Sequence, residues 1–329
     1  MNRVGNTVAA LTVVTALLIL SLSAGLTSSA PLRPLHGDRP LVVCSTTVFG
    51  SIVQELAGDS VDVQVIASPS ICPGHYDVKP SDVYAVGEAD LIFYHGFEPW
   101  VEELVEASRT NATLVKIGGP WNNPSGAKNY YCKVADALEK YLGLDVSDRL
   151  DEALSEVNQT FSRIKEELQE LGANQTNVIC MQWQVGFVSQ LGFNVVKAYP
   201  PPETLSPEDV SELISVGKSK DVALVIDNLQ SGTEFGEYLA EQIGAVHVVL
   251  TNFPGTEPDV NNITAMYLWN AEQLSTALEH HEVMVELSSV KSLLRVYSTA
   301  TYCLIAVVVA EAVVIAYALR VRRPGGSRA

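Results

Sequence analysis

The most regular hydrophobic pattern of the chain lies in segment 147–171, SDRLDEALSEVNQTFSRIKEELQEL. Apolar residues recur there at alternating steps of four and three, namely Leu150, Leu154, Val157, Phe161, Ile164, Leu168 and Leu171. This spacing puts them on one face of a helix with 3.6 residues per turn. Ser147 or Asp145 can cap its start, and Gly172 can end it. We predict a helix of roughly 36 Å, residues 147–172, that links two lobes.

Alternating strand and helix patterns lie on both sides of this helix. Buried strands are expected at 41–47, 61–68, 90–96 and 113–118 before it, and at 177–183, 194–200, 221–228 and 245–252 after it. Helical patterns separate most of these strands, which is typical of parallel α/β sheets. We therefore predict an N-terminal lobe at 41–146 and a C-terminal lobe at 173–282.

The two predicted lobes share a weak internal repeat. Val42-Val43-Cys44 with Gly50 six residues on resembles Val178-Ile179-Cys180 with Gly186 six residues on. Ligands of open α/β sheets bind beyond the carboxyl ends of the strands. A cleft between the lobes would thus bring together the loops that follow Cys44, Ser68, Tyr94, Cys180, Asp227 and Asn252.

Both ends of the chain carry long apolar runs. Residues 1–30 read as an export signal or an N-terminal anchor, because Arg3 precedes an apolar stretch that leads into small residues. Residues 283–295 are expected to form a stalk, 296–319 a transmembrane helix and 320–329 a cytoplasmic tail, since the basic cluster RVRR follows the span. Glu311 lies inside the predicted span, where it either faces a partner helix or is protonated. The predicted protein is a single-pass membrane protein with its binding domain outside the cell.

Charge and cysteine content narrow the choice of partners. The net charge of −17 argues against nucleic acid, which needs a basic face. Cys44, Cys72, Cys132 and Cys180 lie in the predicted exported domain, where an even number favours disulfides or else buried thiols. Four N-glycosylation motifs, at Asn111, Asn158, Asn174 and Asn262, predict a glycoprotein.

One loop gives the chain a family resemblance. Gly74-His75-Tyr76-Asp77, with Pro80-Ser81-Asp82 behind it and then DLIFYHG, resembles the solute-binding receptors of zinc and manganese ABC importers. The similarity extends over most of residues 41–280. It implies two α/β lobes joined by a rigid helix, with a metal held between the lobes by four side chains, typically three histidines and one carboxylate. His75 matches the first histidine.

The other three metal-binding positions of that family differ here. Gly119 stands where the resemblance places the second histidine, in GGPWNNP, with Trp121 and Pro124 retained. Gln182 or Trp183 takes the place of the third histidine. Thr251 and Asn252 take the place of the closing carboxylate.

A remodelled metal site is one interpretation of these differences. His95 and Asp227 each end a predicted strand and can point into the cleft, and Cys72 lies three residues before His75. His75, His95, Asp227 and Cys72 would suit zinc or manganese as the bound divalent metal. Each residue also has an interpretation without a metal. His95 can be a strand-end histidine with hydrogen-bond partners inside the protein, Asp227 a turn or cap residue, and the cysteines buried thiols or disulfides.

A second interpretation keeps the receptor fold and replaces the metal with another small solute. Hydrogen-bonding and stacking side chains at the cleft positions would line such a pocket. They are Thr46, Tyr76, Trp121, Asn123, Gln182, Trp183 and Asn252.

The sequence therefore predicts the extracytoplasmic solute-binding component of an ABC importer. Its expected partners are a membrane permease and a metal or small solute, and the protein is expected to be a monomer. No hydrolase, zinc-protease, phosphate-loop or dinucleotide motif appears in the sequence, so an enzyme is not expected. A non-binding accessory surface protein is the remaining alternative.

Overall fold

The structure is a computed structural model that describes residues 39–321, with side chains described to Arg320. The chain divides into two units, Met1–Arg39 and Pro40–Ala329. The predicted N-terminal signal or anchor, residues 1–30, lies outside the described residues, as does most of the predicted tail. Both predicted lobes belong to the second unit.

The N-terminal lobe is a four-stranded parallel sheet with helices on both faces. Its strands are β1 (Leu41–Cys44), β2 (Asp62–Val65), β3 (Leu91–Tyr94) and β4 (Thr113–Lys116), in the order β2-β1-β3-β4. Its α-helices are α2 (Thr47–Ala57), α3 (Pro80–Glu88), α4 (Trp100–Ser108) and α5 (Pro124–Leu142), and its 3₁₀ turns are η1 (Gly58–Ser60) and η2 (Pro73–His75). The four strands predicted for this lobe are all present.

The C-terminal lobe repeats this arrangement. Its strands are β5 (Asn177–Met181), β6 (Asn194–Tyr199), β7 (Leu224–Asn228) and β8 (Val246–Leu250), parallel and in the order β6-β5-β7-β8. Its α-helices are α7 (Val185–Leu191), α8 (Pro207–Ser219) and α9 (Glu234–Ile243). The short 3₁₀ turns are η3 (Ala173–Gln175), η4 (Gln182–Gln184), η5 (Pro202–Thr204) and η6 (Leu229–Ser231). The common strand order agrees with the internal repeat seen in the sequence.

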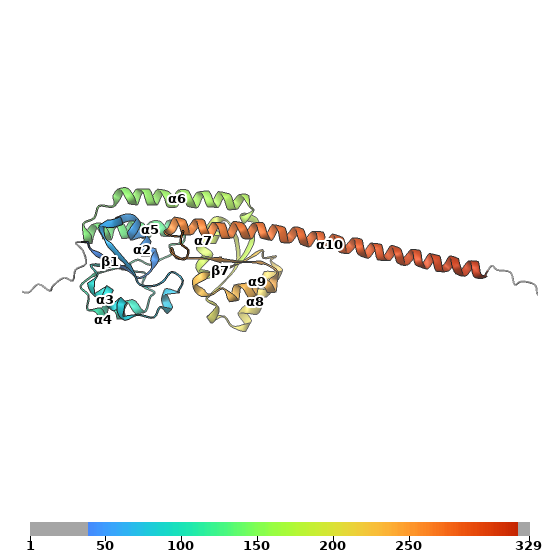
Figure 1. Cartoon of the computed structure of the whole chain (residues 1–329), viewed down its shortest axis with the longest axis horizontal. Helices are drawn as coiled ribbons and strands as arrows, with labels where there is room; N and C mark the ends of the chain where they lie inside the picture. Colours follow the sequence, from blue (N-terminus) through green and yellow to red (C-terminus); the bar gives the residue numbers. More distant parts are fainter. Residues whose placement is uncertain (1–38, 322–329) are drawn as a thin grey trace, which may run out of the picture. The chain divides into compact units, whose positions relative to one another are not determined.

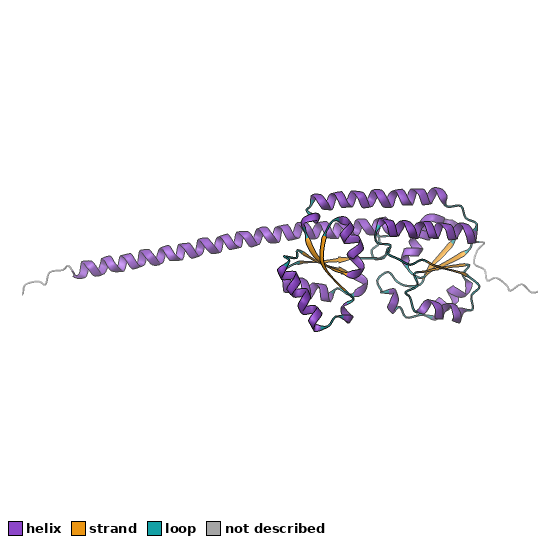
Figure 2. Ribbon diagram, turned by 180° about the vertical axis from the view of Figure 1, so that it is seen from behind, coloured by secondary structure: helices purple, strands orange, loops and turns teal. Residues whose placement is uncertain are grey.

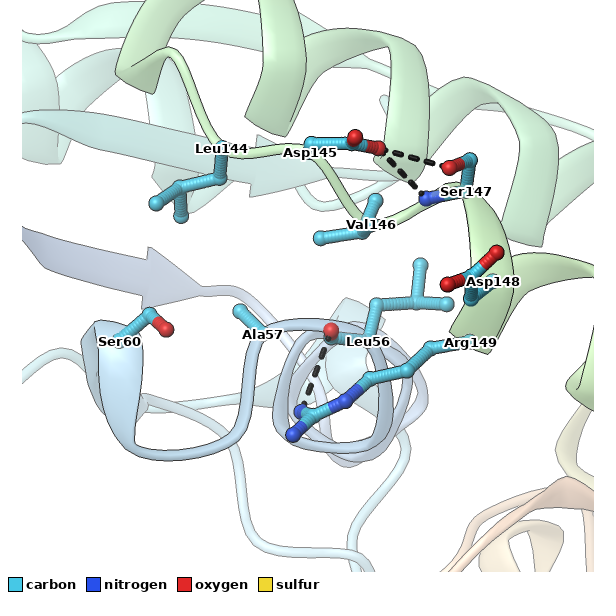
Figure 3. Close-up of a pocket in the computed structure, with 9 residues that line it drawn as sticks. All are labelled: Leu56, Ala57, Ser60, Leu144, Asp145, Val146, Ser147, Asp148 and Arg149. Carbon is cyan, nitrogen blue, oxygen red and sulfur yellow. Dashed lines mark hydrogen bonds between the residues drawn. The ribbon is translucent and has the colours of Figure 1, made fainter.

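The long linking helix is α6 (Ser147–Glu170), and its ends follow local capping chemistry. Val146 is the N-cap residue, and Asp145 just before it accepts hydrogen bonds through Oδ1 from the backbone nitrogen and the hydroxyl of Ser147, the first residue of the helix (Figure 3). These bonds hold the pKa of Asp145 below its usual value. Gly172 follows the helix with a φ of 88°, in the left-handed conformation that glycine tolerates at a helix end. Arg149 donates to the Leu56 carbonyl beside a hollow of about 270 Å³, tying α6 to α2.

One hydrophobic core runs through both lobes. It holds Phe49 and Tyr130 of the first lobe, Phe161 of α6 and Phe187 of the second lobe. The helices α6 and α10 (Ile263–Val321) lie side by side along this core (Figure 1). Each lobe has a further small core on the opposite face of its sheet, under α3 and α4 or under α8 and α9. Figure 2 shows helices on both faces of each sheet. Because interiors are close-packed, the shared core restrains rotation of one lobe against the other.

The helix α10 runs without a break through the segments predicted as last lobe helix, stalk and membrane span. Its residues pack into the shared core up to Leu278, and from Glu282 to Arg320 every residue is exposed. By length and composition, the helix contains a stretch that can cross a membrane.

Of the two expectations for the cysteines, the buried thiols are found at Cys44 and Cys180. All five cysteines are free, so the predicted disulfides are wrong. Cys44 and Cys180 are buried in the central strands of different sheets. Burial raises the pKa of both thiols, which keeps them protonated and unreactive.

Candidate functional site

A cavity of about 1030 Å³ lies between the lobes at the carboxyl ends of their strands. It is lined from both lobes by short loops, which follow β3, β4, β5, β6, β7 and β8 and the segment after β2. This is the place that strand topology predicts for a ligand. The lining residues are Cys72, Pro73, Gly74, His75, Phe97, Gly119, Pro120, Trp121, Asn122, Gln182, Trp183, Gly186, Pro201, Glu203, Asn228, Gln230, Ser231, Asn252 and Phe253.

Hydrogen bonds join the two lobes at the rim of this cavity. Asn122 donates through Nδ2 to Asn252 Oδ1 at 3.0 Å and to the Trp183 carbonyl at 2.7 Å. Trp121 Nε1 donates to the Asn252 carbonyl. Gln230 Nε2 reaches back to the Pro69 carbonyl at 2.8 Å. The amides at the rim are therefore occupied in holding the lobes together.

Other polar side chains in the cavity remain available to a ligand. No hydrogen bond joins the side chains of His75, Gln182 or Glu203 to another described residue. His75, Gln182 and Glu203 are all exposed to the solvent space of the cavity. Aromatic rings complete the lining, from Phe97, Trp121, Trp183 and Phe253. An apolar and aromatic lining with a few free polar groups is typical of sites for small organic molecules.

Six of the residues predicted for the site do line the cavity. They are Cys72, His75, Trp121, Gln182, Trp183 and Asn252. Thr46, Tyr76 and Asn123 do not, because each makes a bond inside the first lobe. Thr46 binds His95, Tyr76 donates to Asp82 Oδ2 at 2.9 Å, and Asn123 caps α5 by accepting from the Gly126 nitrogen.

His95 is buried behind the cavity wall. Only 2% of it is exposed, and its two ring nitrogens contact the hydroxyls of Thr46 and Tyr130 at 2.9 and 2.8 Å. Its ring packs against Trp121 and Phe97, whose ring centroids lie 4.5 and 5.1 Å away. Burial lowers the pKa of His95 to about 4, although the negative charge of Glu98 acts in the opposite direction. The ring is thus neutral at pH 7 and supports the two cavity aromatics.

Asp227 is fully buried in the second lobe, away from the cavity lining. It accepts a hydrogen bond from the Tyr199 hydroxyl and pairs with His247 Nε2 at 2.8 Å. Gly236 packs against this carboxylate, since a Cβ at Gly236 would overlap its oxygens. Asp227 therefore anchors the end of β7 next to Asn228, which does line the cavity.

The four residues predicted for a metal site are not brought together. Within residues 39–321, no group of three or more His, Cys, Asp or Glu side chains could hold a metal ion. His75, His95, Asp227 and Cys72 thus do not form one donor group in this structure, because His95 and Asp227 bond to buried partners. Gly119 adds a backbone obstacle, since its φ of 111° is one that a histidine rarely adopts.

Sequence reasoning missed several lining residues. Pro201 and Glu203 follow β6, whose loop was not among those expected at the cleft. Phe97, Gln230 and Phe253 lie just after strands whose loops were expected there, and Asn228 is the last residue of β7. The rule that ligands bind beyond strand ends, applied to every strand, would have found all of them.

Comparison with known proteins settles the family. The model of the family described as "Zinc-uptake complex component A periplasmic", ZnuA, matches residues 42–277. The chain belongs to this family. The family comprises transport solute-binding proteins rather than enzymes, and the two α/β lobes joined by α6 are the fold that the resemblance implied.

Individual relatives of this ZnuA-family member are distant. The manganese ABC transporter substrate-binding lipoprotein PsaA of Streptococcus pneumoniae is 32% identical over 102 residues, which cover 28% of this chain and 33% of that protein. The iron-binding protein YfeA of Yersinia pestis is 22% identical over 230 residues, covering 62% and 74%. The structure of the periplasmic zinc-binding protein TroA of Treponema pallidum is similar with a TM-score of 0.63 at 18% identity, covering 73% and 99%. The match to PsaA thus spans about a third of that protein's length.

The neutral state of His95 gives a testable pH dependence. The native state resists protonation of His95 until about pH 4, whereas an unfolded histidine titrates near 6.5. Unfolded chains therefore bind more protons between these values, and stability falls as the pH drops. Between about pH 7.5 and pH 5 we expect His95 to account for a loss of about 2 kcal/mol, measured by urea unfolding.

The variant His95→Gln serves as the control, because it cannot titrate in this range. Its unfolding free energy should change by much less over the same interval. Equal losses in the two proteins would mean that His95 does not carry the effect.

Proposed function

We propose that this protein is the extracytoplasmic solute-binding component of an ABC importer, and that its cavity takes a small organic solute rather than a bare metal ion. The observation that carries the proposal is the lining of the interlobe cavity. Zinc takes about four donors at roughly 2.0–2.3 Å, and the described residues provide no such group. The cavity instead offers about 1030 Å³ with aromatic walls.

The free side chains of the cavity suggest the chemistry of the solute. The Glu203 carboxylate accepts hydrogen bonds or pairs with a cation, and Gln182 and His75 can donate or accept. Trp183 offers an exposed ring face for stacking. A solute with an amine or other N–H donors and a flat or apolar part fits these groups. The net charge of −17 also favours neutral or positively charged solutes over anions.

We further propose that α10 anchors the receptor beside a permease. Residues 296–319 would span about 36 Å as a helix, enough for a hydrocarbon core of about 30 Å. Delivery then proceeds with small lobe movements that open the hydrogen bonds at the rim, since the shared core and α6 restrain a wide hinge. We also propose that residues 1–30 direct the chain to export, as a signal or an N-terminal anchor.

Binding experiments on the full chain in detergent test this function. Thermal unfolding is followed with amino acids, nucleosides, monosaccharides and polyamines, and separately with zinc and manganese chloride. One organic class should raise the midpoint and bind in a saturable way. Trp183→Ala and Glu203→Gln should each weaken that binding about tenfold. Glu208→Gln is the matched control, because Glu208 is exposed on α8 outside the cavity.

Elemental analysis provides the opposing test. We expect far less than one equivalent of zinc or manganese on the purified chain. About one equivalent of either metal, lost in His75→Ala, together with no organic ligand, would overturn the proposed solute class and support a metal receptor.

A further inference from the structure

The part of α10 beyond the lobes carries an unpartnered apolar stripe. Val283, Leu287, Val290, Leu294 and Tyr297 follow one another at alternating steps of four and three. They are between 50% and 64% exposed. An apolar stripe with a period of 3.5 residues is the pattern of a helix that packs against a second helix.

The stripe faces away from the lobes. Val283 lies nine residues after Leu274, and Leu274 is buried in the shared core. Nine residues make about two and a half turns of helix, so the two side chains lie on opposite sides of α10. A second helix can therefore approach the stripe without contacting the lobes of the same chain.

Charges beside the stripe are complementary to those of an identical helix. With Val283, Val290 and Tyr297 at heptad positions d, and Leu287 and Leu294 at positions a, Glu286 falls at g and Lys291 at e. In a parallel pair of helices, a g residue meets the e residue five positions further along the partner. Glu286 of each copy would then face Lys291 of the other, in two symmetric ion pairs.

The same stripe continues into the apolar part of the helix. Thr301, Leu304, Val308, Glu311 and Ile315 keep the alternating spacing. Glu311 thus lies at a d position, on the face that a partner would cover. An acidic side chain in a membrane is expensive when it faces lipid and is usually turned toward another helix. This position gives Glu311 a polar partner, the same residue of a second copy, provided that at least one of the two carboxyl groups is protonated and donates a hydrogen bond to the other.

We propose that α10 pairs with α10 of a second copy of this chain, through the stripe from Val283 to Ile315. The parallel orientation follows from the proposed membrane anchoring, because both copies then enter the membrane from the same side. The protein is a dimer in place of the monomer that the sequence first predicts. Each dimer presents two solute cavities on one stem, whatever the solute is.

Cysteine crosslinking in membranes tests the geometry of this interface. Cys72, Cys132 and Cys303 are first changed to serine, since none of them is fully buried. Val290→Cys, on the stripe, should then form a disulfide-linked dimer under mild oxidation. Ser292→Cys is the control, because it lies about 200° round the helix from Val290 and should stay monomeric. Equal crosslinking at both positions, or at neither, would overturn the proposal.

Charge exchange tests the identity of the partner. Sedimentation equilibrium of the purified full chain in density-matched detergent measures the dissociation constant of the dimer. Glu286→Lys and Lys291→Glu should each weaken the dimer roughly fivefold, and the double variant should restore it. A chain that stays monomeric alone and associates only when a permease is added would overturn self-association in favour of that partner. Solute affinity is measured in a separate experiment. The dissociation constant of the dimer therefore tests self-association even if the solute proposal fails.

Discussion

Replacing Phe187 with alanine is expected to lower the free energy of unfolding by about 3–5 kcal/mol. Phe187 is fully buried and packs edge-on against Phe161 of α6, with ring centroids 5.9 Å apart, and against Tyr267 of α10 at 5.5 Å. Loss of this ring leaves a cavity where α6, α7 and α10 meet. Urea unfolding of the full chain in detergent measures the change.

Phe97→Ala is the matched control for this prediction. Phe97 is half exposed and lines the cavity, so its removal should change the free energy of unfolding by less than about 1.5 kcal/mol. A loss as large as that of Phe187→Ala would show that burial in the shared core does not determine the cost of removing the ring.

Replacing Asp227 with alanine is expected to cost about 3 kcal/mol. The change removes the acceptor of the buried Tyr199 hydroxyl and the partner of His247 at once. Tyr199 then keeps only a long contact of 3.4 Å to the Ile226 carbonyl. Thermal and urea unfolding at neutral pH measure the loss.

Two further variants separate the role of the buried carboxylate from a loss of packing. Asp227→Asn keeps the shape and one acceptor, so it should cost less than the alanine variant. Tyr199→Phe removes the hydroxyl but leaves the ring, and combining it with Asp227→Ala should add little. If the two costs are fully additive, Asp227 and Tyr199 do not act as a pair.

The lobes were predictable because buried parallel strands read as short apolar runs. Every predicted strand is present, within a few residues at its ends. Helix α5 was not predicted, because small and aromatic residues such as Ala127, Tyr130 and Tyr131 make up most of its buried face, beside Val134 and Leu138. The Asn123-Pro124 start of α5 was visible in the sequence as a helix-start signal.

The site was predictable in its location and less so in its side chains. Strand topology placed the loops at one cleft, and His75, Gln182 and Asn252 lie there. The direction of a polar side chain at a strand end depends on which neighbouring groups can form hydrogen bonds with it. His95 turns toward Thr46 and Tyr130, and Asp227 toward Tyr199 and His247, and no sequence pattern specified these partners.

Gly119 limits the evolutionary reversibility of this receptor. A histidine there would sit at a φ of 111°, with a strain of about 1–3 kcal/mol, so regaining a metal ligand needs a new main-chain path as well as a new side chain. Gln182 and Asn252 would also have to change before three or four donors meet. Under the proposed solute specificity, a metal site at this position would therefore need a change of the main chain before any change of side chain could supply a ligand.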